Sequence, residues 1–239
     1  MLSRMKAKLD AGRSLLYETA CYVDIYKCLE DIGRDRTLTP EEKQEMKKYQ
    51  RLADAFTPLA KGMNSEYANQ NAYDAISIHG GSGFIMEYKS QRLYRDARIF
   101  SIYEGTTQLQ VVAAIRYISN GTMLNNIKEM ADSLEVSESL KPLKETVDQL
   151  IFLYEKALEN TKRHNDQVVL DFLARRLYDI TAELVMSLLI LRDATKAPEL
   201  FEKSANVYVL MANEDITAKC VYIGTFRPEF LANFRAAEA

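Results

Sequence analysis

The sequence of 239 residues has few of the residues that interrupt helices, with 9 glycines and 5 prolines, roughly half of their usual share. Because glycine and proline mark turns, this scarcity predicts long helices. Charge of one sign is also lacking, since 31 Lys and Arg residues oppose 34 Asp and Glu residues for a net charge of −3. Nucleic acids and anionic membranes bind basic faces, so we predict neither as a partner.

Cysteine and histidine are scarce as well. Cys21 and Cys28 lie two helical turns apart, not in the C-x-x-C spacing of a metal motif, and Cys220 is distant. We therefore predict reduced, buried thiols. His79 and His164 are far apart in the sequence, and we predict no metal site.

Long hydrophobic runs are missing too. The longest apolar run, Val185 to Leu191, is interrupted by Ser187 and is too short to span a bilayer. The first ten residues, MLSRMKAKLD, lack the apolar segment of a signal peptide. We therefore expect a soluble, intracellular protein in the cytoplasm, without a membrane span.

Hydrophobic residues make up 47% of the chain and recur mostly at helical intervals. Between Leu173 and Leu191, for example, leucine or isoleucine recurs every three or four residues. Strand-type alternation of useful length is not found. The sequence predicts an all-α fold of antiparallel helices, with a first domain over residues 1–122 and a helical extension of three or four helices over residues 123–239.

We predict a first helix that ends near Gly33 and a second that begins at Thr39. Thr39, Pro40 and Glu42 indicate a helix start, because threonine caps free N–H groups, proline lacks one, and the glutamate can bond back to the cap. The second helix should run to about residue 56. Pro58 then either opens a third helix or kinks a continuous one, because it lacks the N–H that bonds back along the helix.

Three glycines in four positions, at residues 80–83, form the sharpest break in the sequence. A short helix over 90–97 follows, and the β-branched and aromatic residues 98–103 predict an extended loop. The next helix begins between residues 104 and 107 and ends at Asn120 and Gly121, which tolerate the left-handed conformation.

The glycine tract has two interpretations. It is either a helix C-cap followed by a tight turn, or a stretch of backbone that approaches a phosphate or ribose closely. It is not a dinucleotide-binding fingerprint, because a helix and not a strand precedes it.

Glu104 lies between Tyr103 and Gly105, where an apolar surround would desolvate a carboxylate and make it a stronger base. The alternative is an ordinary first-turn glutamate favoured by the helix dipole. Thr106 and Gln108, like the residue between them, could hold a polar ligand at a helix start or serve as plain caps.

Three motifs, read together, resemble the C-terminal helical domain of flavin-dependent acyl-CoA dehydrogenases. They are DAISIHGGSGF at residues 74–84, RLYRDARI at 92–99 and IYEGTTQLQ at 102–110. They occur in the family's order and spacing, and the resemblance covers roughly residues 1–120.

The resemblance implies that Glu104 removes the α-proton of an acyl-CoA thioester while a hydride passes from the β-carbon to FAD, which gives a trans-2-enoyl-CoA. It also implies that Tyr103 and Gly105 border the thioester, and that Thr106 and Gln108 contact the FAD.

By the same resemblance, Gly80 and Gly81 contact the FAD of a neighbouring subunit, which implies a homo-oligomer, either a dimer or a tetramer. Ser77 stands where many family members carry glutamine, so its contact with the cofactor would be shorter. An electron-transfer flavoprotein would reoxidise the flavin.

Family members begin with a helical domain and a β-domain that grips the flavin ring. The resemblance therefore implies that this chain is a C-terminal portion of a longer enzyme, inactive in isolation, and that residues 123–239 correspond to the extension of larger members. Two alternatives stay open, an acyl-CoA oxidase and a non-catalytic helical oligomerisation module on the same scaffold.

Overall fold

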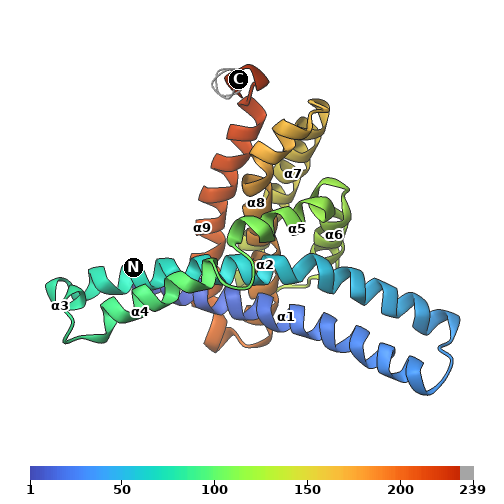
Figure 1. Ribbon diagram of the computed structural model, residues 1–239, viewed down its shortest axis with the longest axis horizontal. Helices are drawn as coiled ribbons and strands as arrows, with labels where there is room; N and C mark the ends of the chain where they lie inside the picture. The colour runs from blue at the N-terminus through green and yellow to red at the C-terminus, as the bar shows by residue number, and fades with distance from the viewer. Residues whose placement is uncertain (232–239) are drawn as a thin grey trace.

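The structure, a computed structural model, describes residues 1–231, and all regular secondary structure in that range is helical. This confirms the all-α prediction. The first two helices, α1 (Leu2–Asp35) and α2 (Pro40–His79), form a long antiparallel hairpin. The short α3 (Gly81–Phe84) turns the chain back, and α4 (Lys89–Ala97) packs along α2 (Figure 1).

The chain then returns to the middle of the hairpin. After η1 (Arg98–Ser101), α5 (Thr107–Ser119) packs against α2, and α6 (Thr122–Ser133) follows it. Three long helices complete the described chain and cross the α1–α2 hairpin in Figure 1. They are α7 (Lys141–Arg163), α8 (Gln167–Lys196) and α9 (Pro198–Thr225), with η2 (Glu138–Leu140) before and η3 (Pro228–Leu231) after them.

The start of α2 is the capping box that the sequence predicts. The backbone N–H of Glu42 donates to the Thr39 hydroxyl over 3.2 Å, and the Thr39 N–H donates to the Glu42 carboxylate over 2.9 Å. Pro58 lies inside one continuous helix, which decides between the two alternatives for this proline. Burial of Phe56, Pro58 and Leu59 in the core compensates for the missing hydrogen bond.

The structure corrects two predictions, one about residues 98–103 and one about the cysteines. Residues 98–103 are not extended, because Arg98–Ser101 forms a 3₁₀ helix and the N–H groups of Ile102 and Tyr103 both donate to the Ile99 carbonyl. Of the thiols expected to be buried, Cys21 and Cys28 are exposed, since they lie on the outward face of α1, whereas the Cys220 thiol is buried. All three cysteines are free thiols, as predicted.

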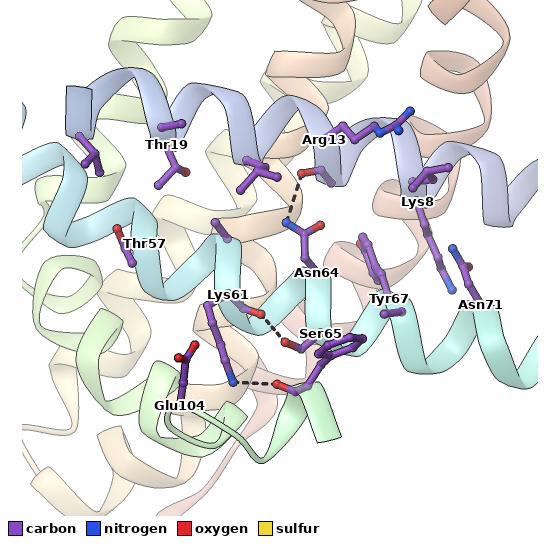
Figure 2. A pocket seen from close by; sticks show the side chains of 18 of the residues that line it. Lys8, Arg13, Thr19, Thr57, Lys61, Asn64, Ser65, Tyr67, Asn71 and Glu104 are labelled. Carbon is purple, nitrogen blue, oxygen red and sulfur yellow. Dashed lines mark hydrogen bonds between the residues drawn. The ribbon is translucent and has the colours of Figure 1, made fainter. Parts of the chain in front are cut away.

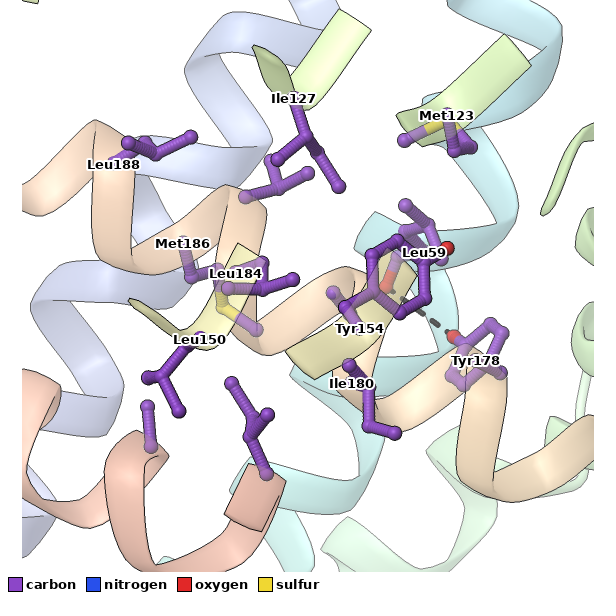
Figure 3. Close-up of a cluster of buried hydrophobic side chains, with 14 of the residues drawn as sticks. Leu59, Met123, Ile127, Leu150, Tyr154, Tyr178, Ile180, Leu184, Met186 and Leu188 are labelled. Carbon is purple, nitrogen blue, oxygen red and sulfur yellow. Dashed lines mark hydrogen bonds between the residues drawn. The ribbon is translucent and has the colours of Figure 1, made fainter. Parts of the chain in front are cut away.

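Helix α8 lies at the centre of one continuous core. Its residues 180–191 are all buried, and side chains from α2, α6 and α7 pack around them (Figure 3). The most apolar run of the sequence therefore lies in the hydrophobic core. Among the described helices, none combines the length and apolar character that crossing a membrane requires. The division into domains near residue 122 stays a prediction.

Polar contacts fasten α8 and α9 to α1. The Ser204 hydroxyl donates to the buried Asp10 carboxylate over 2.6 Å, and the Ser14 hydroxyl donates to Asp193 over 2.6 Å. The hairpin that carries the site is thereby held against the C-terminal helices.

Candidate active site

The loop between η1 and α5 holds Glu104 in a conformation that few residues adopt. Glu104 has φ of 53° and Gly105 has φ of 89°. A non-glycine residue in the left-handed region costs about 1 kcal/mol. A side chain on Gly105 would also bring its Cβ within 2.8 Å of Gln110 Nε2. The loop therefore needs glycine at 105 and contacts that stabilise residue 104.

Lys61, near the middle of α2, supplies those contacts. Its ammonium donates to the carbonyl oxygen of Phe100 over 2.8 Å and to that of Gly105 over 2.5 Å. Figure 2 shows Lys61 and Glu104 side by side below α2. Lys61 was not predicted from the sequence, because no local pattern signals its contacts with Phe100 and Gly105, which follow it by 39 and 44 positions.

Glu104 and Tyr103 stand at the edge of a groove of about 790 Å³ between α1 and α2. On α1 its lining includes Leu9, Leu16 and Val23, which recur every seven residues. The Glu104 side chain is exposed, and the Tyr103 side chain is 63% exposed. The desolvating surround predicted for Glu104 is thus not provided by residues 1–231.

The residues after Glu104 serve partly as caps. The Thr106 hydroxyl accepts a hydrogen bond from the Leu109 N–H over 3.2 Å, which makes Thr106 the N-cap of α5. The buried Thr107 hydroxyl donates to Glu66 of α2 over 2.6 Å. Gln108 is exposed. Thr106 and Gln108 are therefore exposed close to Glu104 in the sequence, whereas Thr107 packs on α2.

The glycine segment lies elsewhere. Gly80 has φ of 58° and ends α2, with its N–H donating to the Ser77 carbonyl over 3.2 Å. Ser77, Gly80 and Gly81 are exposed, and the space around both glycines is open. Gly80 follows Lys61 by 19 residues, about 28 Å along a helix. One chain therefore does not bring these residues next to Glu104.

Comparison with known protein families gives two matches. Residues 39–117 match the model described as "Acyl-CoA dehydrogenase, C-terminal domain", and residues 119–231 match the model "Acyl-CoA dehydrogenase C terminal". Together the two models span the chain from the start of α2 to the end of η3, including the loop with Glu104.

Two curated relatives match about half of the chain. The caffeyl-CoA reductase-Etf complex subunit CarC of Acetobacterium woodii is 36% identical over 46% of this chain and 23% of its own length. The 3-methylmercaptopropionyl-CoA dehydrogenase of Ruegeria pomeroyi is 41% identical over 46% of this chain and 17% of its own length. The chain thus spans less than a quarter of either relative.

The fold also matches a solved structure. An acyl-CoA dehydrogenase from Bacillus anthracis, complexed with FAD, superposes with a TM-score of 0.70 and 22% identity, covering 98% of this chain and 43% of that one. At this identity the likeness concerns the fold alone. It includes α7, α8 and α9, so the arrangement of these helices on the hairpin is not peculiar to this chain.

Proposed function

The chain belongs to the acyl-CoA dehydrogenase family, of which it represents C-terminal helical domains, and from this we propose that it acts within an FAD-dependent enzyme that oxidises an acyl-CoA thioester to a trans-2-enoyl-CoA. Glu104 is the base that removes the α-proton. One observation carries this proposal: a carboxylate is held in a strained, left-handed loop at the mouth of an apolar groove.

The chemistry requires more than the carboxylate. The α-proton of a thioester is too weakly acidic for a solvated carboxylate, so the base must lose water when substrate binds and the thioester carbonyl must be polarised. Because Glu104 is exposed within residues 1–231, the remaining walls of the pocket come from elsewhere in the assembled enzyme. This is why we propose that the chain alone does not turn over substrate.

The residues beside Glu104 are suited to position ligands. Tyr103 and Gly105 border the thioester, and the positive φ of Gly105 keeps that side of the loop free of a side chain. The Thr106 hydroxyl accepts from Leu109, so its hydrogen stays available to donate to a ligand, and Gln108 is exposed two residues further on. We assign Thr106 and Gln108 to the FAD, which when bound supplies the acceptor for the β-hydride.

The exposed glycine segment serves a second subunit in this proposal. Ser77, Gly80 and Gly81 are accessible but lie far along α2 from Glu104, which supports contact with the FAD of a neighbouring copy in a dimer or tetramer. An electron-transfer flavoprotein is the proposed electron acceptor. One relative in this comparison is itself a subunit of an Etf complex.

The test is Glu104→Gln in the enzyme assembled with this chain, assayed for acyl-CoA-dependent dye reduction. Because general-base catalysis contributes roughly 10²- to 10⁴-fold, we expect at least about a hundredfold loss in kcat. Glu45→Gln, an exposed glutamate on α2, is the matched control and should retain activity. Activity of Glu104→Gln within about tenfold of the parent, or 1.4 kcal/mol of barrier, rejects the assignment. Oxygen consumption without dye reduction would identify an oxidase instead.

A further inference from the structure

We propose that Lys61 is a positioning residue that holds the Glu104 loop in its active conformation through the carbonyl oxygens of Phe100 and Gly105. The inference rests on the proposed function only in naming Glu104 as the group that is positioned. The structural part of it concerns the loop itself and can be tested without any activity.

The two hydrogen bonds of Lys61 span the loop. The Phe100 carbonyl lies in η1 and the Gly105 carbonyl lies just before α5. One ammonium therefore bridges both ends of the segment that contains Glu104. Bonds from a charged donor are about twice as strong as those between neutral groups. Within residues 1–231 the Lys61 charge forms no ion pair with a carboxylate, so carbonyl oxygens are its partners.

The helix that carries Lys61 is itself fixed. Ala60 is buried, and the neighbouring Gly62 lies directly under the hydroxyl of Tyr178 on α8. The Ser65 hydroxyl donates to the Lys61 carbonyl over 2.7 Å. Because this turn of α2 is held against the core, the ammonium is presented to the Glu104 loop from a rigid support.

Within residues 1–231, one other side chain bonds to the Gly105 carbonyl. Gln110 Nε2 also donates to the Gly105 carbonyl, but over 3.4 Å, and bonds of that length are weak. The observed left-handed φ of Glu104 is itself energetically unfavourable. Without the Lys61 bonds, the backbone at Glu104 should relax towards negative φ and turn the carboxylate away from the groove.

The first experiment measures amide hydrogen exchange in the 239-residue chain. Lys61→Met removes the donors and keeps most of the stem. Exchange at the Ile102 and Tyr103 amides, which both donate to the Ile99 carbonyl, should therefore accelerate by about tenfold or more, since local opening governs exchange there. Lys61→Arg, which restores charged donors, should stay within about threefold of the parent. The control is Lys47→Met, at an exposed lysine of the same helix. Amides of residues 184–188 on α8 report any global loss of stability.

Exchange at the Ile102 and Tyr103 amides within about twofold of the parent in Lys61→Met overturns the proposal, as does acceleration no greater than that of the α8 amides. If Lys61→Met does not fold, Lys61→Gln replaces it with the same expected direction.

The second experiment measures kinetics in the assembled enzyme. Lys61→Met should lower kcat by about tenfold or more with KM within about threefold, and Lys61→Arg should recover most of kcat, because only the placement of the base changes. The two proposals fail separately. If Glu104→Gln stays active, the proposed function is wrong and the exchange data alone decide the role of Lys61. If Glu104→Gln is inactive while Lys61→Met keeps its kcat, the Lys61 proposal is wrong alone.

Discussion

Tyr178 on α8 places its hydroxyl where any side chain on Gly62 of α2 would have to lie. The hydroxyl donates to the Pro58 carbonyl over 2.8 Å and, more weakly, to the Leu59 carbonyl over 3.4 Å. Figure 3 shows Tyr178 beside Leu59 among the buried side chains. The missing Cβ of Gly62 therefore permits the Tyr178 hydroxyl of α8 to approach the helix that carries Lys61.

Gly62→Ala should destabilise the chain by about 1–3 kcal/mol, because the fully buried Tyr178 cannot move aside. In an ordinary helix interior the same substitution stabilises by about 0.5–1 kcal/mol. A loss of stability, instead of a gain, would therefore identify the contact with Tyr178. Urea unfolding of the 239-residue chain measures it. Gly224→Ala is the control, because a Cβ there would meet its neighbour Asn160 at an ordinary 3.7 Å.

Tyr178→Phe tests the cause of that penalty. Removal of the hydroxyl costs about 1 kcal/mol through its lost hydrogen bond, but it also makes room for a Cβ at residue 62. Gly62→Ala should therefore cost less in the Tyr178→Phe background than in the parent, which is a coupling that a double-mutant cycle detects. Equal costs in the two backgrounds would contradict the contact.

Asp10 is expected to hold α9 against α1. Its carboxylate is 2% exposed, accepts from Ser204 and pairs with Lys6 over 2.5 Å. Asp10→Ala should destabilise the chain by about 1–3 kcal/mol, because Ser204 is then buried without its partner. Asp31→Ala on the exposed face of α1 should change stability by less than about 0.5 kcal/mol. Equal losses for the two variants in urea unfolding would contradict a specific role for Asp10.

The local signals of the sequence explain which parts of the fold were predictable. The capping box at Thr39 and the left-handed Gly121 after α5 depend on neighbouring residues alone. The 3₁₀ helix at residues 98–101 was not predictable, because its conformation is completed by Lys61 on another helix. Similarly, the exposure of Cys21 depends on which face of α1 receives its partners.

The candidate site, like the fold, was predictable only where neighbouring residues in the sequence determine it. The motif around Glu104 pointed to the proposed base, since its residues are contiguous in the sequence. Its support was not predictable, because Lys61 and the Glu66 partner of Thr107 lie more than 35 residues earlier. The sequence likewise did not reveal that Glu104 is exposed within the described chain, since burial depends on which surfaces meet.

Stability should fall as the pH rises towards 8, because of one buried glutamate. Burial raises the pKa of Glu183 to about 8, despite the Lys219 ammonium 2.9 Å away, and Asp215 and Asp179 add to the shift. The unfolded carboxyl group titrates near its ordinary value of about 4.3. Between these values the folded chain retains a proton that the unfolded chain releases, so stability is present below the lower value and lost through the upper one.

Glu183→Gln should remove that dependence. Relative to the variant, we expect the parent chain to lose roughly 2–4 kcal/mol of unfolding free energy between about pH 5 and pH 8. Urea unfolding at three pH values in this window measures the difference. Parallel curves for the two proteins would show that Glu183 does not take up a proton on folding.

The most direct test of the account is α-proton exchange in the assembled enzyme. An acyl-CoA incubated in D₂O should gain deuterium at its α-carbon, as followed by mass spectrometry, because the base removes and returns that proton. Glu104→Gln should slow this exchange by about a hundredfold or more, while Glu45→Gln should match the parent. Exchange in Glu104→Gln within about tenfold of the parent would show that another group removes the proton and that Glu104 is not the base.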